Sequence, residues 1–113
     1  ISSEVDPLTR GGYPKGKIRN PGRLAALLSK YENLYGDLSA NSGYNAISRD
    51  PEYGCKFLEE FQDKLLFGTD ICVVNQEVPI VGYLTSLVQQ GKISWKAFRK
   101  ISRDNAKKLL SLP

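Results

Sequence analysis

Asp70 is the side chain in this sequence that is best placed to do chemistry. It directly follows residues 65–69, a short apolar run that predicts a strand buried on both faces. The carboxyl ends of such strands are where α/β folds build their sites. A carboxylate held there can bind a cation or take a proton from a metal-bound water, and Gly68 on the same face leaves space beside it. The alternative is a carboxylate that only caps a helix or a loop.

Residues 34–39 form a second candidate strand with a polar end. Tyr35, Asp37 and Ser39 alternate with apolar residues or glycine and therefore share one face. Such a face on a buried strand suits a lumen beside a site, whereas an exposed edge is the simpler alternative. The next segment, residues 40–49, is rich in Gly, Asn and Ser and is predicted to be a loop. Ser39, Asn41 and Tyr44 are candidate substrate-binding residues of a pocket wall, unless the segment is only a turn.

The histidine and cysteine content excludes several kinds of site. The chain has no histidine, so it cannot build a Ser-His-Asp triad, a Cys-His pair or a histidine-rich metal site by itself. Cys55 and Cys72 are too few for a disulfide framework, and we expect two reduced thiols in a cytoplasmic protein. Cys72 is expected to be a small buried side chain, with a place in the pocket as the alternative.

The positive charge is concentrated at the C-terminal end. Residues 92–113 hold seven Lys or Arg and one Asp, within a chain of net charge +4. This pattern favours a solvated helix face over a nucleic-acid site, because no aromatic residues are interleaved with the basic ones as in known motifs. No apolar run approaches a membrane span, and the residues from Ile1 onward do not resemble a secretory signal. We therefore expect no nucleic-acid and no membrane partner.

The expected elements alternate between helices and strands along one segment, residues 1–113. Residues 1–20 are predicted to be loop. Strands are predicted at residues 34–39 and 64–69. Helices are expected from Asn20-Pro21 to Asn33, from Asp50-Pro51 onward, from Pro79 to about Gln90, from Ser94 onward, and from about Arg103 to Leu110. This order predicts a parallel α/β sheet, but two strands make a poor one, so the chain is either irregular and mostly helical or part of something larger.

Three segments resemble one family, the amidohydrolase-related proteins. Residues 33–39 (NLYGDLS) and 63–70 (DKLLFGTD) are similar to the last two strands of that family's barrel, and residues 101–110, with Asn105-Ala106, are similar to its closing helix. The resemblance covers residues 20–112. It implies that the fold is the C-terminal part, the last two βα units, of a (β/α)8 TIM barrel. The chain would then be a helix-rich, incomplete barrel, with residues 21–113 forming the βα units and the closing helices.

The same resemblance implies metal-dependent hydrolysis of an amide or related bond in a small-molecule substrate. Asp70 would be both a metal ligand and the catalytic base, and the divalent metal, zinc in the first instance, would be held in the complete barrel only. Since the histidine ligands have no counterpart here, the chain is expected to be inactive alone.

Other functions stay open beside this one. The first is a decarboxylase of the same superfamily. The second is a non-catalytic module that docks on a complementary chain, or a homo-oligomer formed through exposed strand edges. A nucleic-acid-binding domain that uses the basic helices ranks last.

Overall fold

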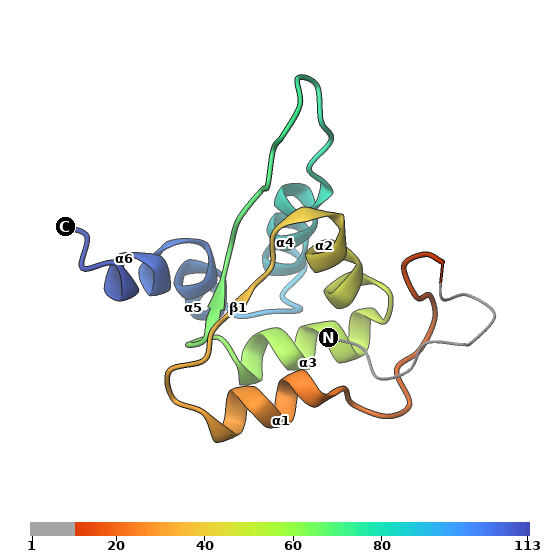
Figure 1. The fold of residues 1–113 in the computed structure, drawn as a ribbon, viewed down its shortest axis with the longest axis horizontal. Helices are drawn as coiled ribbons and strands as arrows, with labels where there is room; N and C mark the ends of the chain where they lie inside the picture. Colours follow the sequence, from red (N-terminus) through yellow and green to blue (C-terminus); the bar gives the residue numbers. More distant parts are fainter. Residues whose placement is uncertain (1–10) are drawn as a thin grey trace.

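The computed structural model describes residues 11–113, which form helices around a small sheet (Figure 1). The loop expected over residues 1–20 is present from residue 11 onward. Its first part, and the start of the chain at Ile1, lie outside the described residues. In chain order the elements are α1 (Arg23–Lys30), β1 (Gly36–Asp37), α2 (Ala40–Ser48), α3 (Pro51–Glu60), β2 (Leu65–Leu66), α4 (Pro79–Gln89), α5 (Trp95–Arg99), the π-helical turn η2 (Lys100–Asp104) and α6 (Asn105–Leu109).

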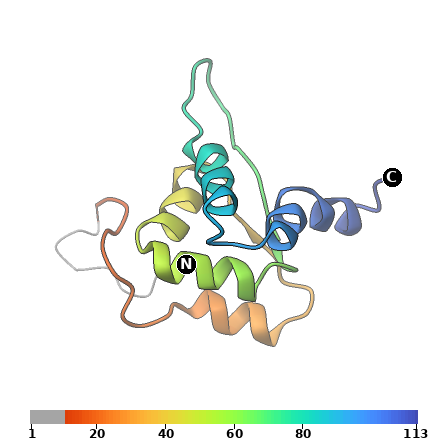
Figure 2. The ribbon, with the colours of Figure 1, turned by 180° about the vertical axis from the view of Figure 1, so that it is seen from behind.

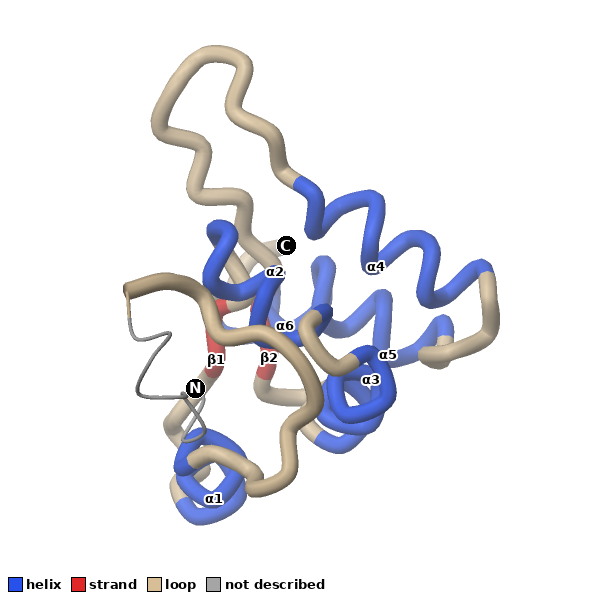
Figure 3. Tube along the Cα trace, turned by 90° about the vertical axis from the view of Figure 1, so that its right-hand side faces the viewer, coloured by secondary structure: helices blue, strands red, loops and turns tan. Residues whose placement is uncertain are grey.

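The two strands pair in parallel, as the alternation of strands and helices predicted. The register places Gly36 opposite Leu65 and Asp37 opposite Leu66. The Leu38 amide donates to the Leu66 carbonyl at 2.9 Å and extends the ladder by one bond. Both strands are shorter than the predicted segments, because within the described residues each has a single strand partner. The carboxyl ends of β1 and β2 therefore lie side by side (Figure 3).

The strands and helices share one apolar core. Leu38 and Leu65 contribute from the sheet, while α4 and α5 cover the side seen from behind in Figure 2. Each fully buried Leu or Ile stabilises the fold by roughly 1.5–3 kcal/mol relative to an exposed one. The predicted alternation in the first strand is confirmed, since Leu38 is buried and Asp37 is exposed. The most deeply buried large side chains are Leu28, Ile47, Leu58, Leu65, Ile80 and Ile101.

Helix α1 is shorter at both ends than the pattern from Asn20 to Asn33 predicted. Gly22, rather than Asn20, occupies the N-cap position. At the other end the Lys64 ammonium donates to the carbonyls of Leu28 at 2.7 Å and Tyr31 at 2.5 Å. A cation on the last carbonyls satisfies groups that a helix leaves unpaired and complements its dipole. The start of β2 thus supplies the C-terminal cap of α1.

The prediction of a loop over residues 40–49 is wrong, because most of that segment is helix α2. Its Gly, Asn and Ser content is typical of turns, but Gly43 serves packing instead. A Cβ on Gly43 would lie 2.1 Å from the carbonyl oxygen of Leu38, so only glycine lets the helix start against the end of β1. Ile47, which is buried, anchors the other end of α2 in the core.

Gly54 likewise allows a close approach, in this case between α2 and α3. A Cβ on Gly54 would lie 1.9 Å from the Ile47 carbonyl oxygen. That oxygen also accepts a hydrogen bond from the Tyr83 hydroxyl of α4 at 3.2 Å. Burial raises the pKa of Tyr83 to about 12, so the hydroxyl keeps its proton at neutral pH and remains a donor. The Ile47 carbonyl of α2 therefore lies against α3 at Gly54 and accepts a hydrogen bond from α4.

The C-terminal helices form one continuous run rather than the two separate helices expected. Ser94 caps α5 as predicted, since its hydroxyl accepts from the Ala97 amide at 3.0 Å. No Gly or Pro interrupts the chain between α5 and α6, and η2 widens the helix without ending it. The Ile101 carbonyl, within η2, accepts from the Phe67 amide at 3.0 Å. The helix is thereby fastened to the outer edge of the sheet.

Asp50 caps α3, as the Asp-Pro pair predicted, and also holds the N-terminal segment. Its carboxylate accepts from the amides of Tyr53 at 3.3 Å and of Ile18 at 2.8 Å. These bonds hold the pKa of Asp50 below its ordinary value of 3.8. Two more bonds fasten residues 13–20, which we call the strap: Asn45 donates to the Pro14 carbonyl at 3.0 Å, and Arg49 to that of Gly16 at 3.1 Å.

Replacement of Gly54 by alanine should lower the free energy of unfolding by roughly 1–3 kcal/mol, because the new methyl group overlaps the Ile47 carbonyl. Gly82 is the matched control: it lies within α4, and a Cβ there meets nothing within 4 Å. Gly82→Ala should therefore raise stability by about 0.5–1 kcal/mol. Urea unfolding of both variants measures the difference. Effects of the same sign at both positions would contradict the close approach of α2 and α3.

The carboxylate of Asp50 should make stability depend on pH. Because the folded-state pKa lies below the unfolded one, its contribution is complete above about pH 5 and is lost as the pH falls through the lowered pKa. Asp50→Asn keeps a capping side chain but removes the charge. The stability difference between the two proteins should be constant from about pH 5 to 7 and shrink below about pH 4. A difference that grows in acid would refute this assignment.

Candidate functional site

Asp37, at the carboxyl end of β1, is held by the residue two positions further along the chain. Asp37 accepts two bonds from Ser39, one from the amide and one from the hydroxyl, both at 2.9 Å. An Asp that bonds two residues further on is a common local motif, so the Asp-x-Ser spacing could have predicted it. The hydroxyl of Ser39 is therefore engaged, and Ser39 also occupies the N-cap position of α2.

Gly68 does not leave open space for a ligand, which corrects the sequence-based expectation. A Cβ on Gly68 would lie 2.9 Å from Cβ of Ser39 and 3.2 Å from Oδ1 of Asp37. The side chains of the neighbouring strand fill the place that the missing side chain leaves. Gly68 is thus required for the two strand ends to approach each other, and it lies directly beside Asp37 and Ser39.

Asp70 lies where the sequence placed it, just beyond the carboxyl end of β2, and its side chain is exposed. Its φ of +52° is left-handed, a conformation that Asp adopts at some cost and that clusters at functional sites. Among the described residues, the thiol of Cys72 is the one group that donates a hydrogen bond to its carboxylate, at 3.6 Å. The carboxylate can therefore accept a proton or a cation from the open side.

The loop over residues 70–78 projects from the carboxyl end of the sheet (Figure 1), and Gln76 holds its base together. The Gln76 side chain donates to the Asp70 carbonyl at 2.9 Å and accepts from the Cys72 amide at 2.9 Å. Both hydrogen bonds restrain the backbone that carries the Asp70 side chain. The sequence analysis missed Gln76, because no spacing motif marks a glutamine that bonds a left-handed residue six positions earlier.

Cys72 differs from the buried side chain that was expected, since it is exposed. Its thiol donates to the carbonyl of Asp70 at 3.5 Å. The negative charge of Asp70 raises the pKa of the Cys72 thiol, which opposes formation of a thiolate. Cys72 is therefore a poor nucleophile. Both cysteines are free, as expected from their number.

The other candidate pocket residues lie apart from Asp70 or in the core. Asn41 is exposed in the first turn of α2. Tyr44 packs edge-on against Tyr83, with ring centroids 5.5 Å apart and an interplanar angle of 86°. A cavity of about 520 Å³ borders β1, and its lining includes Ser42 and Asn45 but not Ser39, Asn41 or Tyr44. The structure brings only Ser39 close to the strand end that leads to Asp70.

The described residues do not build a metal site on their own. No group of three or more Cys, Asp or Glu side chains in residues 11–113 is arranged to hold a metal ion. A catalytic zinc expects about three protein ligands, and Asp70 could supply one of them. A divalent metal would therefore need further ligands from outside these residues.

Most of the basic C-terminal residues are exposed, and several are paired with acids. Lys100 contacts Asp63 at 2.6 Å, and Asp104 contacts both Arg99 at 2.9 Å and Arg103 at 3.0 Å. These pairs are consistent with a solvated face. No helix in the described part of the chain is both long enough and apolar enough to span a bilayer.

Comparison with known families agrees with these features. A family model described as Amidohydrolase matches residues 11–112, nearly the whole chain. The chain belongs to the amidohydrolase family. A search of curated proteins and a search of solved structures each gave no match.

Removal of the Gln76 side chain should loosen the loop base without unfolding the chain. In Gln76→Ala the Cys72 amide loses its acceptor, so its hydrogen exchange should accelerate by about tenfold, the equivalent of one hydrogen bond. The exposed Gln89 at the end of α4 provides the control, and Gln89→Ala should leave that exchange unchanged. Unaltered exchange in the Gln76 variant would show that the side chain does not hold the loop.

Proposed function

We propose that this chain is the C-terminal part of the barrel of a metal-dependent amidohydrolase, with Asp70 as a metal ligand and the catalytic base. The observation that carries the proposal is the position of Asp70, an exposed left-handed carboxylate at the carboxyl end of one of two parallel strands. Sites of (β/α)8 barrels lie at that end of their strands. Membership of the amidohydrolase family supports the same assignment.

In this proposal β1 and β2 are the last two strands of the barrel, and their carboxyl ends form part of the floor of the site. Asp70 would accept a proton from the attacking water and later return it to the leaving group. Gln76 would hold the backbone that aims its carboxylate. A bound divalent metal, zinc in the first instance, would make that water more acidic.

The remaining metal ligands would come from strands outside this sequence, because the chain has no histidine. The chain alone would then bind a metal weakly and would not turn over substrate. The complete enzyme would act on a small molecule with an amide or related bond.

The decisive experiment replaces Asp70 by asparagine in the protein that joins these residues to the rest of the barrel. Asparagine tolerates the left-handed backbone, so the fold should persist. Turnover of an anilide substrate should fall by roughly 10²–10⁴, the usual contribution of a general base. Zinc affinity, measured by competition with a chromophoric chelator, should fall as well.

Asp63 provides a matched control, because it precedes the same strand at its amino end and is exposed. Asp63→Asn should leave turnover and zinc affinity unchanged. Full turnover in Asp70→Asn, with urea unfolding like that of the parent protein, would refute the assigned role.

A further inference from the structure

The loop over residues 70–78 carries apolar side chains into solvent. Ile71 is 60% exposed, Val73 is 64% exposed and Val74 is 88% exposed. Single exposed apolar residues are ordinary on protein surfaces, but three of them within four consecutive positions are typical of a binding surface. In Figure 1 the loop rises from the carboxyl end of the sheet, which is the end that carries Asp70.

The tip of this loop has a defined shape. The Gln76 amide donates to the Val73 carbonyl at 3.3 Å and closes a turn in which Asn75 is left-handed, with a φ of +65°. At the far end of the loop, Val78 packs against the apolar core. Valine has few side-chain rotamers, so little entropy is lost when Val73 and Val74 are covered by another molecule. The turn therefore presents its apolar side chains to solvent instead of burying them against the chain.

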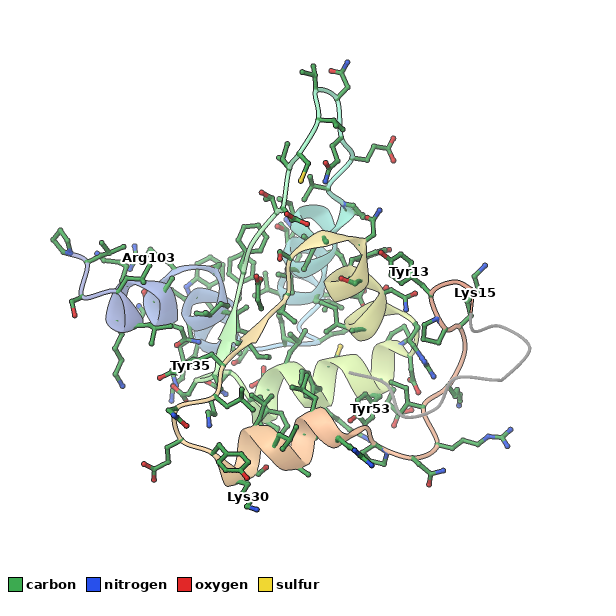
Figure 4. The ribbon with its side chains drawn as sticks, in the orientation of Figure 1. Tyr13, Lys15, Lys30, Tyr35, Tyr53 and Arg103 are labelled. Carbon is green, nitrogen blue, oxygen red and sulfur yellow. The ribbon has the colours of Figure 1, made fainter. Side chains whose placement is uncertain are left out.

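The segments that follow the two strands carry no positive charge. Residues 37–48 and 65–91 contain no Lys or Arg, and all of their charged residues are acidic. Figure 4 shows Lys15, Lys30 and Arg103 on other parts of the molecule, away from the projecting loop. An anionic group that left water beside the loop would find no cation in these segments to pair with. The loop therefore favours an uncharged, apolar ligand and offers no attraction to an anionic membrane surface.

We infer that Ile71, Val73 and Val74 form one wall of the substrate site and select substrates whose group beside the scissile bond is apolar and uncharged. This inference rests on the proposed function, in which Asp70 acts at that bond. Ile71 directly follows Asp70, and the thiol of Cys72 donates to the Asp70 carboxylate at 3.6 Å. The loop that follows a strand of a (β/α)8 barrel lines the site at that end. A substrate held at Asp70 therefore has the apolar side chains of the loop as neighbours.

The test uses the protein that joins these residues to the rest of the barrel, with three anilides as substrates. Hexananilide and 4-butylacetanilide each lengthen acetanilide by four carbon atoms, the first on the acyl side of the amide bond and the second on the amine side. Burial of each methylene group strengthens binding by roughly fourfold, so one of the two should exceed acetanilide in kcat/KM by about tenfold or more. A carboxylate at the end of the same added chain should abolish that preference.

Substitution of the two valines assigns the preference to the loop. Val73→Thr combined with Val74→Thr keeps the branched shape of both side chains but replaces a methyl group of each by a hydroxyl. The preference for the longer anilide should fall by about tenfold. Val81, which is 49% exposed on α4, is the matched control, and Val81→Thr should leave the preference unchanged.

A binding measurement separates this inference from the proposed function. In the Asp70→Asn protein, calorimetry should show about tenfold tighter binding of the preferred anilide than of acetanilide. Retained turnover in that variant, with the chain-length preference intact, would refute the catalytic base and leave the apolar wall intact. Loss of turnover with equal binding of all three anilides would refute the apolar wall and leave the catalytic base intact.

Three results would overturn the inference. The first is an equal kcat/KM for all three anilides in the parent protein. The second is a preference for the anilides that end in a carboxylate, which would place a cation beside the loop. The third is a Val73 and Val74 variant that keeps the full preference but unfolds at lower urea concentration, because the tip would then pack against another part of the barrel.

Discussion

The parallel ladder between β1 and β2 is the constraint that determines where the functional groups of this chain can lie. In a parallel pair both carboxyl ends open on the same side, so Asp37, Ser39 and Asp70 are gathered there although they come from distant parts of the sequence. The ladder is only two residues long, and it depends on Gly68, whose missing side chain makes room for the neighbouring strand end. A register shift of one residue would move the polar face of β1 into the core.

Within the described residues, the two outer edges of the sheet have different neighbours. On the outer edge of β2, the Asn105 side chain donates to the Leu65 carbonyl, and the Phe67 amide donates to the Ile101 carbonyl. On the outer edge of β1, helices and the strap surround a hollow instead of filling it.

Local signals predicted much of this architecture. The Asp50-Pro51 pair and Ser94 marked helix starts that the structure contains. The apolar run before Asp70 marked a strand, in which Leu65 is buried but Leu66 is only half-buried. Helix α2 was missed because glycine is typical of turns, so Gly43 favoured a loop. The actual role of Gly43 is its close approach to the Leu38 carbonyl, a contact that exists only after folding. The space assigned to Gly68 was misjudged for the same reason. Gln76 donates to the carbonyl of Asp70, whose left-handed backbone conformation no residue pattern predicts.

The π-helical turn at Lys100–Asp104 carries one residue more than an α-helix of the same rise would hold. In an ordinary α-helix successive residues are about 100° apart around the axis, so deletion of that residue would rotate everything beyond it by about that angle. Asn105 would then turn away from the carbonyls of Gln62 and Leu65, and the closed edge of the sheet would open. The loss of a single codon within this turn would therefore be enough to remove both hydrogen bonds of the Asn105 side chain.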